Sequence, residues 1–221
     1  MRTIAVISQK GGAGKTTLAL HIAVAAEMAG YSTVVLDMDS QGTAEAWSEW
    51  RKEAPPVVVP AKTTTLARTL EKVQAHGADL VIMDTPPVAE AEARTAAKTA
   101  DLVLIPCRPN AFDVHSIKTT ADLSRFAGKP AFAIFNAGPV AAARLYAETA
   151  ELVAEIGLQI APARLSERAA FRHATGSGQT AQETEPSSKA AAEVAELWNW
   201  ICQQVGMPPR KRATKRAKVS T

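Results

Sequence analysis

The chain has little of what disulfide-rich, metal-binding or membrane proteins are built from. Cysteine occurs only twice in 221 residues, and Cys107 and Cys202 are far apart and lack metal-ligand spacing. No apolar run approaches the roughly 18 residues of a membrane span. Charged and glycine residues follow the first apolar residues too early for a signal peptide. These absences favour a cytoplasmic protein whose two cysteines are reduced.

Acidic residues are missing from the end of the chain, residues 208–221. This segment carries six basic residues, namely Arg210, Lys211, Arg212, Lys215, Arg216 and Lys218. Without these six, the net charge of the chain changes from +3 to −3. We therefore expect a folded domain over 1–207 and a basic, disordered tail over 208–221, which either binds nucleic acid or another anionic surface or is simply solvated. The tail also lacks the apolar residues of a membrane-inserting helix.

Short apolar segments alternate with helical patterns along the rest of the chain. Strands are expected near 3–8, 32–37, 56–59, 79–84, 101–106, 130–135 and 158–160. Helices are expected near 15–29, 42–52, 65–75, 89–99, 111–127, 140–155, 166–174 and 186–205. This alternation predicts an α/β fold: one mostly parallel, twisted sheet of about seven strands with helices on both faces, and ligands at the carboxyl ends of the strands.

A glycine-rich motif, Lys10-Gly-Gly-Ala-Gly-Lys-Thr-Thr17, follows the first apolar strand and opens the first helix. Glycine allows close approach of the backbone to a phosphate, and the helix N-terminus adds a positive dipole end. We expect phosphate to be bound by Gly11, Gly12, Ala13, Gly14, Lys15, Thr16 and Thr17. Lys15 would reach the β- and γ-phosphates, and the Thr16 hydroxyl would hold Mg²⁺. The usual first glycine of a P-loop is replaced by Gln9, and a second lysine, Lys10, follows it.

Three aspartates end expected strands. Asp37 and Asp39 occupy alternate positions and share a face of an extended segment, so both can point at the phosphate site. Four apolar residues precede Asp84, which fits the Walker B pattern of a carboxylate that holds Mg²⁺ through water. A lone aspartate of this kind is usually a cap or turn residue, but three beside a P-loop predict a nucleotide site. We select Asp39 to orient an attacking water, with Asp37 supporting it.

Together these motifs resemble the ParA/Soj branch of the deviant-Walker ATPases, within the MinD/ParA superfamily. The resemblance is carried by Lys10–Thr17, Asp37-Met-Asp39-Ser-Gln41-Gly, Asp84-Thr-Pro-Pro, Ile105–Asp113, Phe135-Asn136 and a series of motifs within 163–190. It covers about residues 1–205, and the early P-loop is similar to that of small plasmid-type ParA proteins. It implies a single P-loop NTPase domain with ATP and Mg²⁺ as cofactors.

The resemblance also implies roles for two further residues, and this sequence departs from the family pattern at one position. Lys10 matches the lysine that reaches across an ATP-sandwich homodimer to the phosphates of the partner subunit. Since Lys15 already serves the phosphates of its own subunit, a second lysine is free to act in trans. Asn136 matches a position near the adenine, although an asparagine before Ala-Gly-Pro also suits a turn. Ser40 replaces a family proline, which could loosen the Asp39 loop or cap the next helix and so change the rate of hydrolysis.

The function implied is that of a DNA-partitioning ATPase. The ATP-bound dimer would bind DNA without sequence preference and be released by slow hydrolysis, stimulated by a ParB-like or ribbon-helix-helix centromere-binding protein. It would segregate a plasmid or chromosome and associate with the nucleoid. Candidate DNA-binding residues are Arg144, Arg164, Arg168, Arg172, Arg210, Lys211 and Arg212. Surface solubility or intramolecular ion pairs are the alternative roles for the arginines of the body.

Arg168 and Arg172 are four residues apart and would share a face of a helix. The few aromatic residues near these arginines argue against recognition of single strands by stacking. A ParA-like switch that positions a protein cargo, in conjugation, in secretion or in another protein cluster, is the alternative function. A MinD-like membrane switch is disfavoured by the polar tail, and a nitrogenase-like reductase by the lack of paired cysteine ligands.

Overall fold

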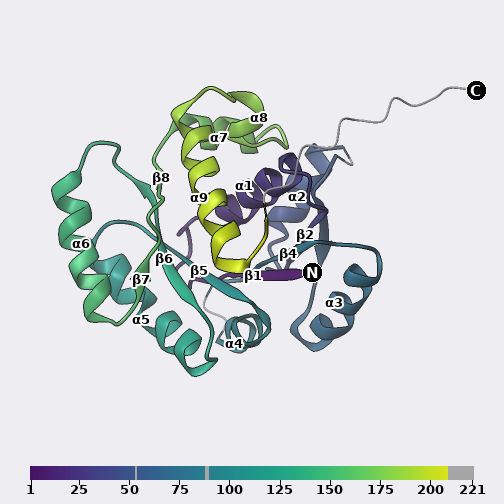
Figure 1. Ribbon diagram of the computed structural model, residues 1–221, viewed down its shortest axis with the longest axis horizontal. Coiled ribbons are helices and arrows are strands. Elements are labelled where there is room, and N and C mark those ends of the chain that lie inside the picture. Colours follow the sequence, from purple (N-terminus) through teal and green to yellow (C-terminus); the bar gives the residue numbers. More distant parts are fainter. Residues whose placement is uncertain (53, 88–89, 209–221) are drawn as a thin grey trace, which may run out of the picture.

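The computed structural model describes residues 1–52, 54–87 and 90–208. The proposed tail residues Arg210, Lys211 and Arg212 lie outside the described residues. A single sheet runs through the middle of the molecule, and helices lie on both of its faces (Figure 1). Its strands are β1 (Arg2–Val6), β2 (Thr33–Asp37), β3 (Val57–Pro60), β4 (Leu80–Asp84), β5 (Leu102–Cys107), β6 (Ala131–Gly138), β7 (Gln159–Ile160) and β8 (Leu165–Ser166).

Helices connect the strands from β1 to β7, and three more helices follow β8 within the described residues. The helices are α1 (Lys15–Met28), α2 (Thr43–Trp50), the 3-10 turn η1 (Thr63–Thr65), α3 (Leu66–Ala75), α4 (Glu90–Thr99), α5 (Ala111–Phe126), α6 (Ala143–Glu155), α7 (Ala169–Thr175), α8 (Ala181–Thr184) and α9 (Lys189–Val205). None of the helices in the described ranges has both the length and the apolar character needed to cross a bilayer.

The strand order, β3-β2-β4-β1-β5-β6-β7 with β8 beside β6, decides where a ligand can bind. All of the pairings between described strands are parallel. Strands β2 to β4 lie on one side of β1, and β5 to β8 lie on the other. The carboxyl end of β1 is therefore a topological switch point, the usual binding position in an open α/β sheet. Asp84 pairs in register with both Val6 and Asp37 there, so the three strand ends meet.

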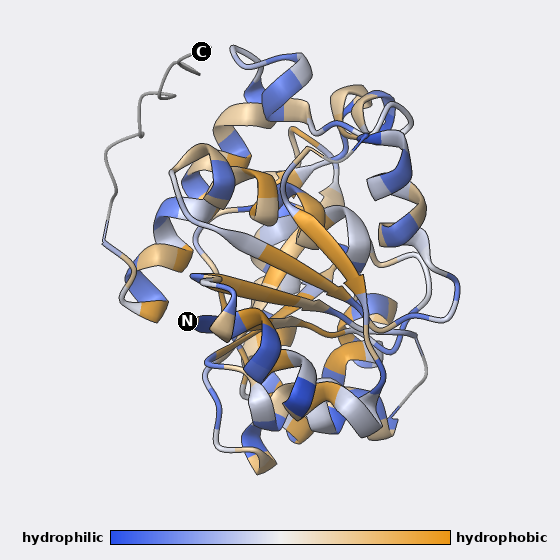
Figure 2. Cartoon of the chain, turned by 90° about the vertical axis from the view of Figure 1, so that its right-hand side faces the viewer, coloured by the Kyte–Doolittle hydropathy of each residue, from blue (hydrophilic) through white to orange (hydrophobic). Residues whose placement is uncertain are grey.

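The sheet is buried on both faces, which explains its nearly continuous apolar strands. In β1, Ile4 and Val6 pack toward α1 and α9, whereas Ala5 packs into a second core beneath α3 to α6. Figure 2 shows the apolar strands between the two helical layers. Helix α1 is covered by α9, and most of its residues are buried. The predicted fold class is thus confirmed.

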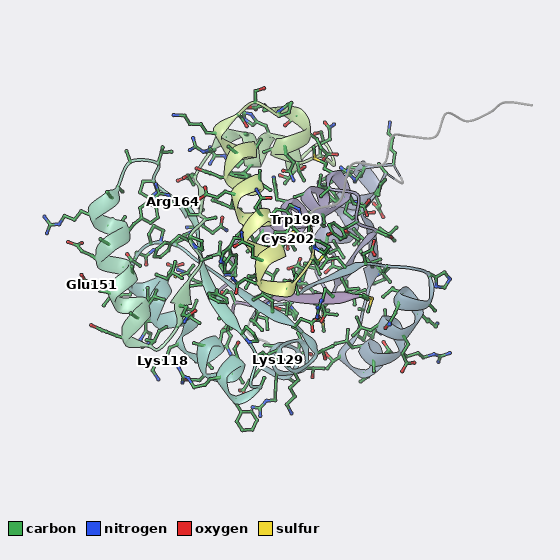
Figure 3. The ribbon with its side chains drawn as sticks, viewed as in Figure 1. Lys118, Lys129, Glu151, Arg164, Trp198 and Cys202 are labelled. Atoms are coloured by element: carbon green, nitrogen blue, oxygen red, sulfur yellow. The ribbon has the colours of Figure 1, made fainter. Side chains whose placement is uncertain are left out.

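Both cysteines are free. Cys107 is buried at the end of β5, and Cys202 is half-buried on α9, where Figure 3 labels it near Trp198. Burial raises the pKa of the Cys107 thiol to about 12 and that of Cys202 to about 11. Both thiols are therefore protonated at neutral pH, the form in which a thiol is a poor nucleophile.

Candidate nucleotide site

The loop between β1 and α1 has the backbone shape that an anion site requires. Gly14 precedes α1 with a φ of 87°, and a Cβ added there would lie 2.2 Å from the amide nitrogen of Asn136. Only glycine therefore fits this position. No side chain caps the N-terminus of α1, so its first N–H groups remain available to an anion.

Asp84 is a buried polar group of the site whose carboxylate oxygens lack hydrogen-bond partners within the described part of the chain. It is only 1% exposed, and neither carboxylate oxygen has a hydrogen-bond partner among the described residues. Burial raises the pKa of Asp84 to about 7, and repulsion from Asp37 and Asp39 acts in the same direction. The Thr16 hydroxyl, which lies near the carboxylate without the geometry of a regular hydrogen bond, and the Lys15 ammonium oppose this rise only in part. A buried carboxylate that lacks a partner, beside a threonine hydroxyl, fits a Mg²⁺ ion that arrives with a nucleotide.

Lys15 is buried at the start of α1, and burial lowers its pKa. The nearby charges of Asp84 and Asp39 act in the opposite direction and favour the ammonium form. The structure thus brings Lys15, Asp84 and Asp39 together at one end of the sheet.

Asp37 links the Asp39 loop to the start of α2. Its Oδ2 accepts hydrogen bonds from the N–H groups of Ala44 (2.9 Å) and Glu45 (3.1 Å), and its Oδ1 accepts one from Asp39 N (3.0 Å). Asp37 therefore caps α2, and its charge also helps to raise the pKa of Asp84, so Asp37 lies near the candidate metal site. Ser40 is exposed, and the N-cap position of α2 is Gly42, so the expectation that Ser40 caps this helix is wrong. The first N–H groups of α2 need acceptors, and the buried carboxylate of Asp37 meets that need.

Asn136 lies in β6 and contacts the P-loop directly. Its Nδ2 donates a hydrogen bond to the carbonyl oxygen of Ala13 at 2.9 Å. Both residues line a cavity of about 260 Å³ beside the loop, which Leu165, Phe171 and Thr175 also line. Asn136 is a strand residue rather than a turn residue, and its amide nitrogen holds the loop.

Lys10 is held by an acidic residue that sequence analysis did not select. Its Nζ lies 2.5 Å from Oδ2 of Asp113, in the first turn of α5. Arg108 also contacts the loop, since its Nη2 donates to the Gly12 carbonyl oxygen at 3.3 Å. Both residues belong to the Ile105–Asp113 motif, and this motif was the feature of the sequence that indicated a segment near the site. Their pairing with the P-loop depends on tertiary contacts that the motif does not specify.

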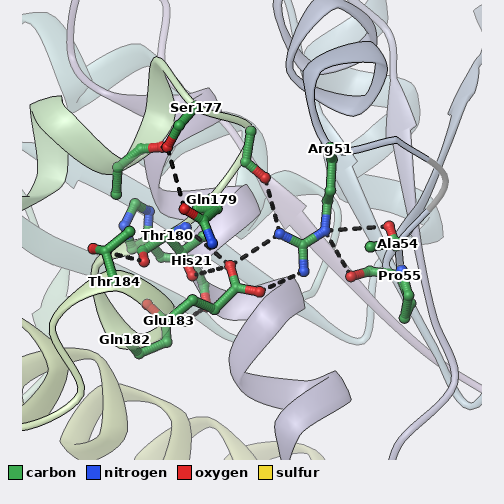
Figure 4. Close-up of polar contacts among 12 residues, drawn as sticks. His21, Arg51, Ala54, Pro55, Ser177, Gln179, Thr180, Gln182, Glu183 and Thr184 are labelled. Atoms are coloured by element: carbon green, nitrogen blue, oxygen red, sulfur yellow. Dashed lines mark hydrogen bonds and ion pairs between the residues drawn. The ribbon is translucent and has the colours of Figure 1, made fainter.

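A buried polar network behind the loop joins α1, α2 and α8 (Figure 4). The Nε2 of His21 accepts from Ala181 N at 3.2 Å, and the Gln182 amide donates to the His21 carbonyl oxygen at 2.7 Å. Arg51 forms a two-pronged ion pair with Glu183, at 2.7 and 2.9 Å. The network therefore fixes the P-loop helix relative to α2, the helix that follows Asp39.

The four arginines of the body that were expected to bind DNA all have partners within the chain. Arg144 pairs with Glu148, Arg168 with Glu193, and Arg172 with Glu167. Arg164, labelled in Figure 3, lies with its guanidinium 4.1 Å from the ring centroid of Tyr146.

The expected shared helical face of Arg168 and Arg172 does not exist. Arg168 has an extended backbone and precedes α7, and Ser166 two residues earlier belongs to β8. Helix α7 begins only at Ala169, with Arg168 as its N-cap, so the four-residue spacing does not lie within one helix, although both side chains line the cavity beside the P-loop.

Known proteins are similar to this chain in sequence or in fold. Residues 4–181 match the CobQ/CobB/MinD/ParA nucleotide binding domain. The "Maintenance of carboxysome distribution protein A" of Gloeobacter kilaueensis is 36% identical over 51% of this chain and 52% of its own length. The "Protein ParA" of Rhizobium radiobacter is 33% identical over 51% of each chain. The matched part thus spans about half the length of each of these relatives.

Among solved structures, the MinD cell division protein of Aquifex aeolicus superposes with a TM-score of 0.74. It is 17% identical, and the match covers 96% of this chain and all of that one. At this identity the likeness supports the fold alone. The domain match covers most of the chain. The P-loop motif and the strand-end aspartates of this chain lie at the switch point of the sheet, where a nucleotide would bind. The chain therefore belongs to the CobQ/CobB/MinD/ParA nucleotide binding domain family.

Proposed function

We propose that this protein is an ATP-driven partition switch, which dimerises with ATP, binds DNA without sequence preference and leaves it after hydrolysis. The observation that supports the ATPase assignment best is the buried, unpartnered carboxylate of Asp84, next to Lys15 and Thr16 at the switch point of the sheet. A buried carboxylate without a partner destabilises an apolar core, whereas a metal–nucleotide site requires one.

Each residue of the site has a distinct task in this proposal. The free N–H groups at the start of α1 and the Lys15 ammonium bind the phosphates. Thr16 and Asp84 hold Mg²⁺, which when bound neutralises charge on the β- and γ-phosphates. Asp39 orients the attacking water, and Asp37 keeps the Asp39 loop attached to α2. Asn136 holds the P-loop beside the cavity that we assign to the nucleoside.

The dimer and DNA steps rest on Lys10 and on the basic residues. We assign Lys10 to the phosphates of the second subunit, as an arginine finger acts elsewhere. Arg144, Arg164, Arg168 and Arg172, with Arg210, Lys211 and Arg212 of the tail, are assigned to DNA phosphates. Because the arginines of the body have intramolecular partners, DNA must compete with those contacts, and the tail gains importance. A ParB-like or ribbon-helix-helix protein is the proposed activator.

The first test measures ATP-induced dimerisation and DNA binding together. We expect the wild-type protein to form dimers by light scattering with ATP, but not with ADP, and to bind DNA only as a dimer. Lys15→Ala should bind no ATP. Lys10→Ala should bind ATP as a monomer without dimerising, and Asp39→Ala should remain dimeric on DNA because it hydrolyses ATP too slowly. Lys118→Ala, which changes an exposed lysine on α5, is the matched control.

Normal dimers of Lys10→Ala would refute the trans role of Lys10. Unchanged turnover of Asp39→Ala would refute the water-orienting role of Asp39. Absence of ATP binding by the wild-type protein would refute the proposed function altogether.

A second candidate function is suggested by the relative that is named for carboxysome distribution. The same ATP switch would then position a protein cargo rather than a replicon. An unstable plasmid that carries the gene and its neighbouring reading frame separates the two functions. Improved plasmid retention supports segregation, whereas unchanged retention together with a regular spacing of protein clusters supports cargo positioning.

A further inference from the structure

A buried carboxylate on a neighbouring helix holds the Lys10 side chain in place. The side chain of Lys10 is 38% exposed, whereas that of Asp113 is 4% exposed, and their charged atoms are 2.5 Å apart. The contact joins the P-loop to α5, about a hundred residues later in the chain. In the absence of a partner subunit, the ammonium of Lys10 therefore already has a defined position at the open edge of the loop.

Asp113 is itself fixed by its surroundings. The Asn110 side chain caps α5 by accepting a hydrogen bond from Asp113 N at 2.9 Å, and the Ser116 hydroxyl donates to the Asp113 carbonyl oxygen at 2.7 Å. A carboxylate in the first turn of a helix is also favoured by the helix dipole. The nearby Cys107 thiol stays protonated, because burial foremost and then the Asp113 charge raise its pKa to about 12.

We propose that Asp113 is the positioning residue for Lys10, and that it holds the ammonium ready for the phosphates of a second subunit. This inference rests on the trans role of Lys10 in the proposed function. An ammonium group has three donors, and the contact with Asp113 uses one of them, which leaves the others for phosphate oxygens. A lysine stem is flexible, so fixing it beforehand reduces the entropy that is lost when the dimer forms.

The burial of Asp113 favours a contact with Lys10 that persists in the dimer over one that must break when the dimer forms. If Lys10 left this site to reach the partner, the Asp113 carboxylate would remain buried without the cation that pairs with it in this structure. An uncompensated buried charge is strongly unfavourable. A contact that persists in the dimer avoids this penalty. Asp113 thus extends the nucleotide site to α5 without touching the nucleotide itself.

The test is a double-mutant cycle on ATP-induced dimerisation, with variants Asp113→Asn, Lys10→Ala and the double variant. We expect Asp113→Asn to raise the protein concentration needed for half-dimerisation by about 10-fold, since a charge-assisted hydrogen bond is lost. The affinity of the monomer for ATP should change less than about 2-fold, because Lys15 serves those phosphates. In the Lys10→Ala background, Asp113→Asn should have no further effect. Asp122→Asn, an exposed aspartate on the same helix, is the matched control.

Two results would overturn the inference while the proposed function stands. Asp113→Asn could dimerise as well as or better than the wild-type protein, which would mean that Asp113 has no effect on dimerisation or opposes it by restraining Lys10. Alternatively, it could weaken dimerisation equally with and without Lys10, which would make its role purely structural. Normal dimerisation of Lys10→Ala would instead refute the trans role on which the inference rests. If Asp113→Asn does not fold, Asp113→Glu keeps the charge but shifts the ammonium, and unchanged dimerisation of that variant would also overturn the inference.

Discussion

Among single residues, Asp84 shows how the nucleotide site lowers the stability of the nucleotide-free fold. Its pKa is raised by burial from 3.8 to about 7, so the folded state keeps a proton that the unfolded chain releases between about pH 4 and pH 7. The favourable contribution of this proton is complete below the unfolded pKa and is lost as the pH rises through the folded pKa. Asp84→Asn should therefore stabilise the protein by an amount that grows across this window, to roughly 2–4 kcal/mol.

Urea unfolding of Asp84→Asn and of the wild-type protein at about pH 4, 5.5 and 7.5 measures this difference. His21 titrates with the opposite sign, because burial lowers its pKa to about 4, so its contribution is present above its unfolded pKa of 6.5 and is lost as the pH falls through about 4. Both proteins contain His21, and its contribution cancels in the comparison. A stability difference that does not vary with pH would show that folding does not raise the pKa of Asp84.

The sequence predicts most residues of the site but not their hydrogen-bond partners. Lys15, Thr16 and Asp84 are predictable because a P-loop and an aspartate at a strand end depend on local patterns. Asp37 and Asp39 look alike in an extended segment, and only the position of α2 shows that Asp37 caps this helix. The pairing of Lys10 with Asp113 joins distant parts of the chain, and no local pattern encodes it.

Among the elements, the segment from α7 to α8 is attached to α2 by Arg51 and by the Trp47 indole, which donates to the Gln179 carbonyl oxygen at 3.2 Å. The Arg51 side chain is 8% exposed and bonds both carboxylate oxygens of Glu183 as well as the Gly178 carbonyl oxygen. Burial alone would raise the pKa of Glu183, but hydrogen bonds from Arg51 and Thr180 hold it below its usual value. Arg51→Ala should thus reduce the free energy of unfolding by about 2–3 kcal/mol, because a half-buried carboxylate loses its partner.

The matched control is Arg94→Ala, which removes an exposed i,i+4 pair with Glu90 on α4. It should cost less than about 1 kcal/mol. Urea unfolding measures both variants, and equal losses would mean that the Arg51 pair behaves as an ordinary surface contact.

The larger elements are predictable from sequence, whereas two of the small ones, β8 and α8, are not. Strands such as β4 are apolar throughout because both faces of the sheet are covered, and this composition is visible in the sequence. In contrast, β8 and α8 are only two and four residues long, and their positions are set by β6 and by the Arg51 network. Tertiary contacts therefore also decide that α7 begins only after Arg168.

At the scale of the whole molecule, the charge is divided between a body that is acidic overall and a basic tail. The six basic residues of 208–221 lie in a segment whose sequence contains no acidic residue. In the body, by contrast, Arg144, Arg168 and Arg172 each have an ion-pair partner. Phosphate contacts made by unpaired cations release counterions from DNA, and each such contact contributes about 0.9 to the salt slope of binding. The tail should therefore contribute more of the slope than the body.

Truncation after Met207 should lower the DNA affinity of the ATP-bound dimer and flatten its salt dependence, while ATP-induced dimerisation stays unchanged because the nucleotide site is intact. The measurement is DNA affinity with ATP at several salt concentrations, for the full chain, the truncated chain and Arg144→Ala. Arg144 is 92% exposed and already paired with Glu148, so its removal should change the slope less than truncation does. An unchanged slope in the truncated chain would show that the tail is only solvated. A larger change in Arg144→Ala would show instead that DNA breaks the ion pairs of the body, and that the body carries the DNA-binding surface.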